Sequence, residues 1–81
     1  MNTCKLCELS AGGSGTVSAL RGSGSQNKRL ADLGLTKGTP VQCLHISPLG
    51  DPAAYRIRGC VIALRHSDAQ AVLIAKEADA N

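Results

Sequence analysis

The sequence has almost no aromatic residues and no long hydrophobic run. Tyr55 is the single aromatic among 81 residues, since there is no Phe and no Trp. Single-stranded nucleic acids stack on aromatic side chains and proline-rich peptides dock in aromatic grooves, so both ligand classes are disfavoured. No stretch approaches the roughly 18 apolar residues that cross a membrane, and the N-terminus lacks the layout of a signal peptide. The sequence therefore favours a soluble, intracellular protein that is not embedded in a membrane.

The chain also lacks the short motifs that carry common enzymatic chemistry. It contains no glycine-rich phosphate loop with its lysine, no His-Glu-x-x-His metal motif and no nucleophile elbow. Nine basic and six acidic residues give a net charge of +3, an ordinary value for solubility that does not by itself indicate a polyanionic partner. The sequence thus predicts a protein that is not an enzyme.

Four cysteines are present, and their spacing leaves two interpretations open. Cys4-x-x-Cys7 could supply half of a zinc or iron site, completed by Cys43 and Cys60 or by the two histidines, but the second half lacks close spacing. Alternatively, Cys43 and Cys60 are small buried hydrophobic residues, and the terminal pair is mobile. Free thiols are favoured over disulfides because no secretory context is visible. We expect no cofactor, and these four cysteines remain the candidates for a transition metal.

The stretch of residues 29–41 predicts a helix end, a turn and a strand start in immediate succession. Gly34 supplies the left-handed residue that ends a helix, and Leu35 then folds back on Leu30 in a Schellman ending. Gly38 takes the positive-φ position of the type II turn that follows. Gly34 and Gly38 are therefore expected to be structural turn residues.

Five short strands are expected, separated by turns rich in Gly and Pro. They are residues 15–21, 41–47, 54–58, 60–64 and 72–75. The apolar alternation slips by one between Cys43 and Leu44, which indicates either a β-bulge or burial of both faces of the strand. Residues 60–64 follow a tight turn at Gly59 and are apolar on both faces, so we expect them to lie centrally in the sheet. With too few residues for two sheets, the strands predict a small, partly open β-barrel.

One helix and two helical turns accompany these strands. We expect Ser25 to cap the helix, which runs to Leu33. One helical turn follows Thr3 as its cap, and another spans residues 68–71 behind a capping box that begins at Ser67. Residues 1–81 make a single domain, because a chain of this length supports one small core, and the last residues, 77–81, are expected to form a frayed tail.

Several motifs in this order resemble the FeoA family, small proteins of bacterial ferrous iron transport. These motifs are Leu6-x-x-Leu9-x-x-x-Gly13, Arg29-Leu30-x-x-Leu33-Gly34-Leu35-x-x-Gly38-x-x-Val41, Pro48-Leu49-Gly50-Asp51-Pro52, Arg58-Gly59 and Ala63-Leu64-Arg65. The resemblance covers nearly the whole chain, although Lys37 stands where the family often has proline. It implies a mainly β fold, a small SH3-like, partly open five-stranded barrel with one or two short helices. The same barrel is the last domain of some iron-dependent repressors.

The resemblance also implies a function. The chain would be a non-enzymatic, cytoplasmic accessory or regulatory protein of ferrous iron uptake. It would act by binding the membrane permease that carries a GTP-binding domain, which makes it peripheral to the inner membrane when bound. The alternatives are a small metal-binding protein that uses Cys4 and Cys7, a pair outside the family pattern, and a nucleic-acid-binding SH3-like module. The basic patch of that module would comprise Lys28, Arg29, Arg56, Arg58 and Arg65.

A surface for the partner protein is predicted on one loop and one helix face. The loop holds a Leu between two prolines, which limit the conformational entropy lost on docking. The helix begins with basic residues that its own dipole disfavours, either as tolerated surface charge or as a spot kept for a partner. Leu30 and Leu35 either extend this aliphatic surface or belong to the core. The predicted partner-binding residues are Lys28, Arg29, Leu33, Leu49, Gly50, Asp51 and Pro52.

Overall fold

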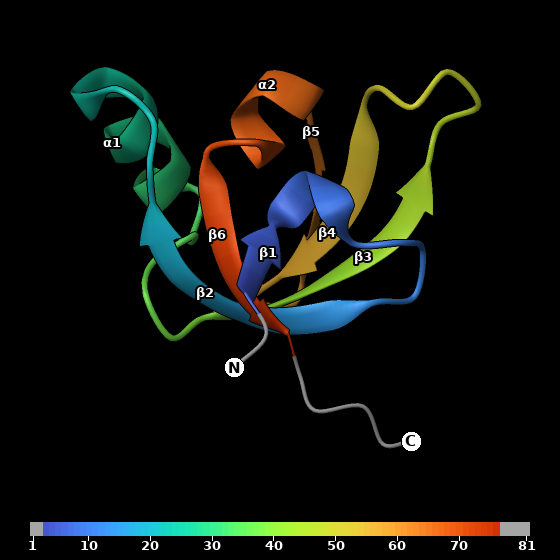
Figure 1. The fold of residues 1–81 in the computed structure, drawn as a ribbon, viewed down its shortest axis with the longest axis horizontal. Helices are drawn as coiled ribbons and strands as arrows, with labels where there is room; N and C mark the ends of the chain where they lie inside the picture. Colours follow the sequence, from blue (N-terminus) through green and yellow to red (C-terminus); the bar gives the residue numbers. More distant parts are fainter. Residues whose placement is uncertain (1–2, 77–81) are drawn as a thin grey trace.

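Six antiparallel strands form one curled sheet in the computed structural model, which describes residues 3–76 (Figure 1). The elements in chain order are β1 (Thr3–Lys5), the 3₁₀ turn η1 (Leu6–Glu8), β2 (Ser14–Leu20), α1 (Gly24–Asp32), β3 (Pro40–Ile46), β4 (Ala53–Ile57), β5 (Cys60–Leu64), α2 (His66–Ala69) and β6 (Val72–Lys76). The strand order is β1-β6-β2-β3-β4-β5, and β1 and β5 do not pair, so the barrel is open. The predicted frayed tail at 77–81 lies outside the described residues.

The curled sheet surrounds a small aliphatic core. Its residues include Leu6, Leu9, Val17, Leu30, Leu35, Val41, Cys43, Tyr55, Ile57, Leu64, Val72 and Ile74. Tyr55 is only 2% exposed, so the single aromatic side chain belongs to this core and offers no stacking surface. No helix among the described residues has the length and apolar character needed to span a membrane.

The predicted helix ending is confirmed. Gly34 has a φ of +106°, and its N–H donates to the carbonyl of Ala31 at 2.9 Å. The N–H of Leu35 donates to the carbonyl of Leu30 at 3.1 Å, which is the second bond of a Schellman motif. Leu30 and Leu35 are both 0% exposed. This contact joins the end of α1 to the core, so both leucines belong to the core rather than to a surface.

The two tight turns that follow are also confirmed. Gly38 has a φ of +89°, and the N–H of Thr39 donates to the carbonyl of Thr36 at 3.0 Å, as a type II turn requires. Arg58 and Gly59 have φ values of +53° and +81°, the pattern of a two-residue hairpin turn between β4 and β5. A single glycine at the position that needs a positive φ is therefore enough to predict each of these turns.

The predicted irregularity in β3 is a β-bulge. Cys43 pairs with Tyr55, and His45 then pairs with Ala54, so Leu44 is the extra residue on β3. The bulge explains why the apolar alternation slips in the sequence while Cys43 still faces the core.

The prediction that residues 60–64 lie centrally is wrong. β5 pairs only with β4 and forms an edge of the sheet, and Val61 is 61% exposed. Its apolar run includes Cys60 and Ala63, which are exposed as well. Leaving small or single apolar side chains in water costs little, so a continuous apolar run does not require burial on both faces.

One strand was missing from the prediction, and Thr3 is not a helix cap. Thr3 lies in β1, where it pairs with Ala75 of β6, while Lys5 pairs with Leu73. A strand of three residues is too short to carry a period-two signal, so its existence depends on the partner strand. The sheet therefore has six strands where the sequence indicated five.

The two other predicted helix caps, Ser25 and Ser67, are wrong as well. Ser23, rather than Ser25, caps α1, because its Oγ accepts the N–H of Gln26 at 3.2 Å. The side chain of Asn27 accepts the N–H of Gly22 at 2.9 Å, which orders the chain just before the helix. The helix then begins at Gly24, directly after its cap Ser23.

The second helix, α2, begins at His66 rather than at residue 68, and the expected capping box at Ser67 does not form. Its cap comes instead from the loop between β3 and β4, where Oδ1 of Asp51 accepts the N–H of His66 at 2.9 Å. A cap supplied from so far along the chain leaves no local spacing signal.

A candidate partner-binding rim

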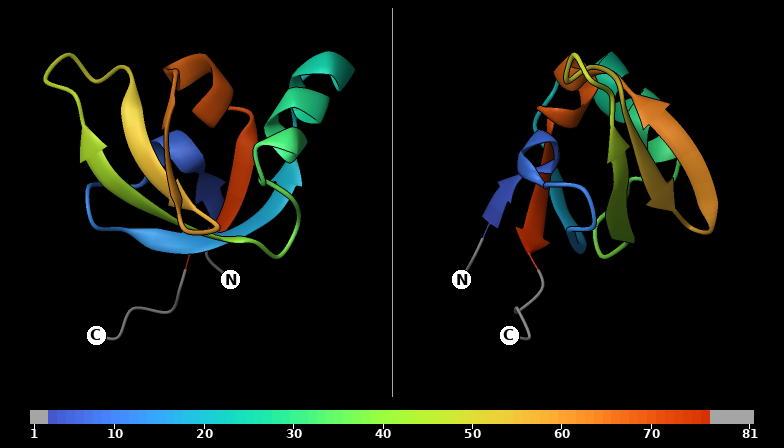
Figure 2. Two further views of the ribbon diagram at one scale, coloured as in Figure 1. Left: turned by 180° about the vertical axis from the view of Figure 1, so that it is seen from behind. Right: turned by 90° about the vertical axis from the view of Figure 1, so that its right-hand side faces the viewer.

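Three elements that are distant in the sequence meet along one rim of the curled sheet. They are α1, α2 and the β3–β4 loop at residues 47–52, which we call the rim (Figures 1 and 2). In Figure 1, α2 lies between the other two, and the sheet curves away below all three. The rim thus gathers the loop and the helix on which the partner-binding residues were predicted.

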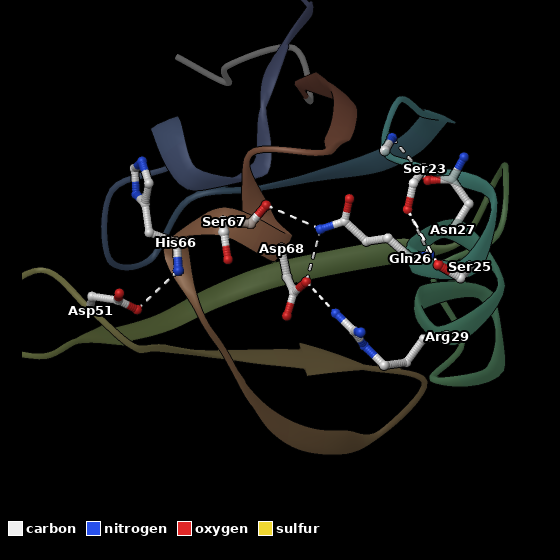
Figure 3. Close-up of polar contacts among 10 residues, drawn as sticks. Ser23, Ser25, Gln26, Asn27, Arg29, Asp51, His66, Ser67 and Asp68 are labelled. Atoms are coloured by element: carbon white, nitrogen blue, oxygen red, sulfur yellow. Dashed lines mark hydrogen bonds and ion pairs between the residues drawn. The ribbon is translucent and has the colours of Figure 1, made fainter.

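The short helix α2 connects the other two elements through a chain of polar contacts (Figure 3). On one side, the carboxylate of Asp51 accepts the N–H of His66. On the other side, Oδ1 of Asp68 accepts a hydrogen bond from Nε2 of Gln26 at 3.0 Å and forms an ion pair with Arg29. These contacts hold the loop and α1 in a defined position relative to each other. This role of α2 is not visible in the sequence, because the bonds join residues far apart along the chain.

The β3–β4 loop is a closed turn that projects one apolar side chain. The N–H of Gly50 donates to the carbonyl of Ser47 at 2.8 Å, and the N–H of Ser47 donates to the carbonyl of Pro52 at 3.2 Å. Gly50 has a φ of +84°. Leu49 is 93% exposed, more than any other large hydrophobic residue in the described part of the chain. The backbone of the loop is therefore ordered by its own bonds, while Leu49 contributes almost nothing to the core.

The helix residues of the prediction divide between two sides of α1. Lys28 and Arg29 are exposed, and the guanidinium of Arg29 points to Asp68 on α2 (Figure 3). Leu33 caps the end of the helix, is 37% exposed, and lines a groove beside Ile57 and Ile62 of the β4–β5 hairpin. The structure thus brings Arg29 to the rim with the loop and places Leu33 on a separate surface.

Beneath the loop is a cavity of about 20 Å³, lined by residues that include Cys7, Gly50, Tyr55 and His66. A space of this size holds at most one water molecule. Burial raises the pKa of the Tyr55 hydroxyl to about 12, so this group is neutral across the physiological range. The interior next to the loop therefore has no room for a small-molecule substrate, so we consider the outer surface of the rim as the candidate site.

The four cysteines are not arranged as a metal site. Among residues 3–76, no group of three or more His, Cys, Asp or Glu side chains could hold a metal ion. Cys4 lies in β1 and Cys7 in η1, both half-buried, so the terminal pair is part of the fold. Cys43 is buried as one interpretation expected, whereas Cys60 is exposed. Burial raises the pKa of the Cys4, Cys7 and Cys43 thiols, and a raised pKa opposes the thiolate form that binds metals.

Comparison with known proteins assigns the family. The FeoA domain family matches residues 4–76. The solution structure of the FeoA protein from Chlorobium tepidum is 32% identical, with a TM-score of 0.85 over 93% of this chain and 71% of that one. A FeoA-like protein from Clostridium acetobutylicum is 25% identical, with a TM-score of 0.91 over 100% of this chain and 94% of that one.

Two further structures concern the fold and the metal. The FeoA of Stenotrophomonas maltophilia, complexed with zinc and described as a procaryotic SH3 domain protein, is 28% identical, with a TM-score of 0.79 over 89% of each chain. A manganese-dependent transcriptional repressor in complex with manganese is 18% identical, with a TM-score of 0.85 over 94% of this chain and 37% of that one, which shows a shared fold alone. No match is found among curated protein sequences. The predicted mainly β, SH3-like fold is confirmed, with six strands in place of five, and the chain belongs to the FeoA family.

Proposed function

We propose that this FeoA-family chain is a non-enzymatic accessory protein of ferrous iron uptake that docks on the cytosolic, GTP-binding part of the membrane permease. Family membership supports the transport role. The observation that carries the docking role is the exposure of Leu49 on a loop whose backbone is held by its own hydrogen bonds. The protein would act in the cytoplasm and be peripheral to the membrane while bound.

The exposed Leu49 side chain suits a docking anchor on energetic grounds. Burying a Leu side chain that starts fully exposed contributes about 1.5–3 kcal/mol, and binding energy in interfaces concentrates in a few such residues. Because Gly50 and Pro52 take part in the bonds that close the loop, little backbone entropy is lost when the loop is covered. The same residue does little for folding, so its apolar character has no evident use in the isolated chain.

The charges along the rim indicate the chemistry of the partner patch. Lys28 and Arg29 of α1 and Arg65 at the start of α2 are exposed on or beside the rim. Asp68 is half-buried and compensates only Arg29 within the described residues. The loop itself carries the exposed Asp51. The partner patch would therefore combine an apolar pocket for Leu49 with acidic groups that face α1 and the start of α2, and these charges would mainly affect the rate of association and the orientation of docking.

The experiment that tests the transport role is deletion of this chain from its own cells. Uptake of radiolabelled ferrous iron should fall in the deletion strain and return when the wild-type chain is expressed from a plasmid. The level of the permease in the membrane is measured in parallel, so that a loss of permease is not mistaken for a loss of regulation. Intact uptake in the deletion strain, with the permease as its only ferrous iron route, would contradict the assignment.

A further inference from the structure

The two edges of the sheet differ in how they are protected. β1 is three residues long and ends with Lys5, and short or charged strands resist pairing with other chains. β5 is five residues long and pairs with β4 in unbroken register from Leu64 opposite Ala53 to Cys60 opposite Ile57. It contains no Lys, no Pro and no bulge, and no strand among the described residues pairs with its outer side. The right-hand view of Figure 2 shows β5 as the outermost strand.

An edge of this kind exposes a row of unpaired backbone N–H and C=O groups, which is the template for the addition of a further strand. We propose that β5 accepts an extended segment of another protein as a seventh strand of the sheet, and that this segment carries alternating apolar residues flanked by acidic ones. This surface shares the end of α1 and Arg65 with the rim but does not include the β3–β4 loop that holds Leu49. The proposal does not depend on the transport role.

The side chains on both faces of β5 suit an alternating apolar segment. Val61 and Ala63 alternate with Cys60 and Ile62 along the strand, so the two pairs lie on opposite faces. Cys60 and Ile62 line a groove of about 500 Å³ that runs between β5 and the end of α1. At the end of α1, the exposed side chain of Leu33 also lines this groove. Alternate side chains of an added strand would enter this groove, while the others would lie beside Val61.

The charges around β5 select an acidic segment. Arg56 lies opposite Val61 on β4, Arg58 is in the turn before β5, and Arg65 follows its last residue. All three are exposed, and none forms an ion pair with a carboxylate of the described chain. Asp32 is the one carboxylate that lines the groove. The guanidinium of Arg58 donates to the hydroxyls of Thr36 and Thr39, which leaves its charge uncompensated. The strand itself is uncharged and lies between Arg58 and Arg65, so it complements a segment whose ends are acidic.

The same charges argue against a second copy of this chain as the occupant. Two β5 strands paired antiparallel about Ile62 would bring Arg58, in the turn before β5 of one copy, close to Arg65, which follows β5 of the other copy. Like charges at such short spacing destabilise a pair of strands. A partner with acidic ends avoids this repulsion, so we assign the edge to a segment of a different protein.

The test uses the purified full chain and a synthetic peptide of alternating valine and threonine with two acidic residues at each end. Binding is followed by NMR, and hydrogen exchange is measured for the amides of residues 60–64. We expect saturable shifts centred on β5, with slower exchange at those of its amides that point outward. A peptide with lysine ends should bind at least tenfold more weakly, and a peptide N-methylated at alternate positions, which cannot complete the ladder, should not bind.

Two matched variants locate the site. Val61→Glu adds a negative charge at the edge and should weaken the binding of the acidic peptide about tenfold. Leu49→Glu makes the same change at an exposed residue of the rim and should leave the affinity unchanged. The proposal is overturned if the acidic peptide fails to bind at millimolar concentration, if its shifts centre on the rim, or if the free chain sediments as a dimer that Val61→Glu dissociates. None of these outcomes depends on iron uptake, so the result is independent of the transport proposal.

Discussion

The corner at residues 30–39 and the β3–β4 loop at residues 47–52 have similar backbone turns, but they differ in the exposure of their leucine side chains. Each has a Leu next to a glycine with positive φ, and each closes its backbone with local hydrogen bonds. In the corner, Leu35 is 0% exposed and packs in the core, whereas Leu49 in the loop is 93% exposed. The same turn chemistry therefore holds the fold together in one place and presents a side chain to solvent in the other.

The surroundings of the glycines show the same contrast. A Cβ placed on Gly34 would lie 3.1 Å from Cδ of Arg58 and 3.2 Å from Cγ2 of Ile57, because the β4–β5 hairpin packs against the corner. A Cβ placed on Gly38 or on Gly50 would meet nothing within 4 Å. Changes in the corner should therefore affect stability, and changes at the tip of the loop should affect binding.

The largest effect is expected for Gly34→Val. A β-branched residue with a positive φ is strained by about 1–2 kcal/mol or more, and its side chain would also overlap Arg58 and Ile57 at a further cost of about 1–3 kcal/mol. Gly38→Ala, with the same sign of φ and open space around it, should cost only the strain. Urea unfolding midpoints measure both variants. Equal losses in the two would show that the hairpin does not confine the corner.

A smaller effect is expected for Asp51→Ala, which removes the cap of α2. Losing a helix cap costs about 0.5–2 kcal/mol, and the amide of His66 should exchange faster with solvent because its hydrogen bond is lost. Asp51→Asn keeps an acceptor oxygen and should lose less. Thermal unfolding and amide exchange would record both effects. If Asp51→Ala melts like the wild type, the loop is not tied to α2 in the way the structure indicates.

The smallest loss of stability among these three is expected for Arg29→Ala. Its ion pair with Asp68 lies partly in solvent, since the Arg29 side chain is 59% exposed, and exposed pairs contribute about 0–1 kcal/mol. The loss should shrink further in high salt, because salt screens exposed charges. Lys28→Ala, an adjacent charge on the same helix, is the control and should show no such salt dependence. A large, salt-independent loss for Arg29→Ala would contradict the description of this ion pair as a weak, solvent-screened contact.

Features that depend on neighbouring residues could be predicted from the sequence, and features that depend on distant residues could not. The ending at Gly34, the turn at Gly38 and the bulge after Cys43 were predictable, because each is determined by residues within a few positions. The strand β1 and the edge position of β5 were not, because strand pairing depends on partners elsewhere in the chain. The cap of α2 was missed for the same reason, since Asp51 and His66 are 15 positions apart.

The candidate site was predictable to a similar extent. The loop was selected from the sequence because it holds Leu49 between two prolines, which limit the entropy lost on docking. The contribution of α2 to the rim was not visible, because the bonds from Asp68 to Gln26 and Arg29 join residues about forty positions apart. Leu33 was grouped with the loop on sequence grounds, and the structure places it on the groove beside β5. The partner-binding role of these residues remains a prediction.

The docking role of Leu49 is tested by ferrous iron uptake in deletion cells that express Leu49→Ser. Because Leu49 is 93% exposed, the purified variant should melt within about a degree of the wild type, as surface substitutions usually do. Leu49→Met, which keeps an apolar side chain of similar size, is the matched control and should restore uptake. Our account predicts that Leu49→Ser folds and accumulates normally but leaves uptake near the level of the deletion strain. Uptake equal to the wild type from a folded Leu49→Ser protein would contradict it.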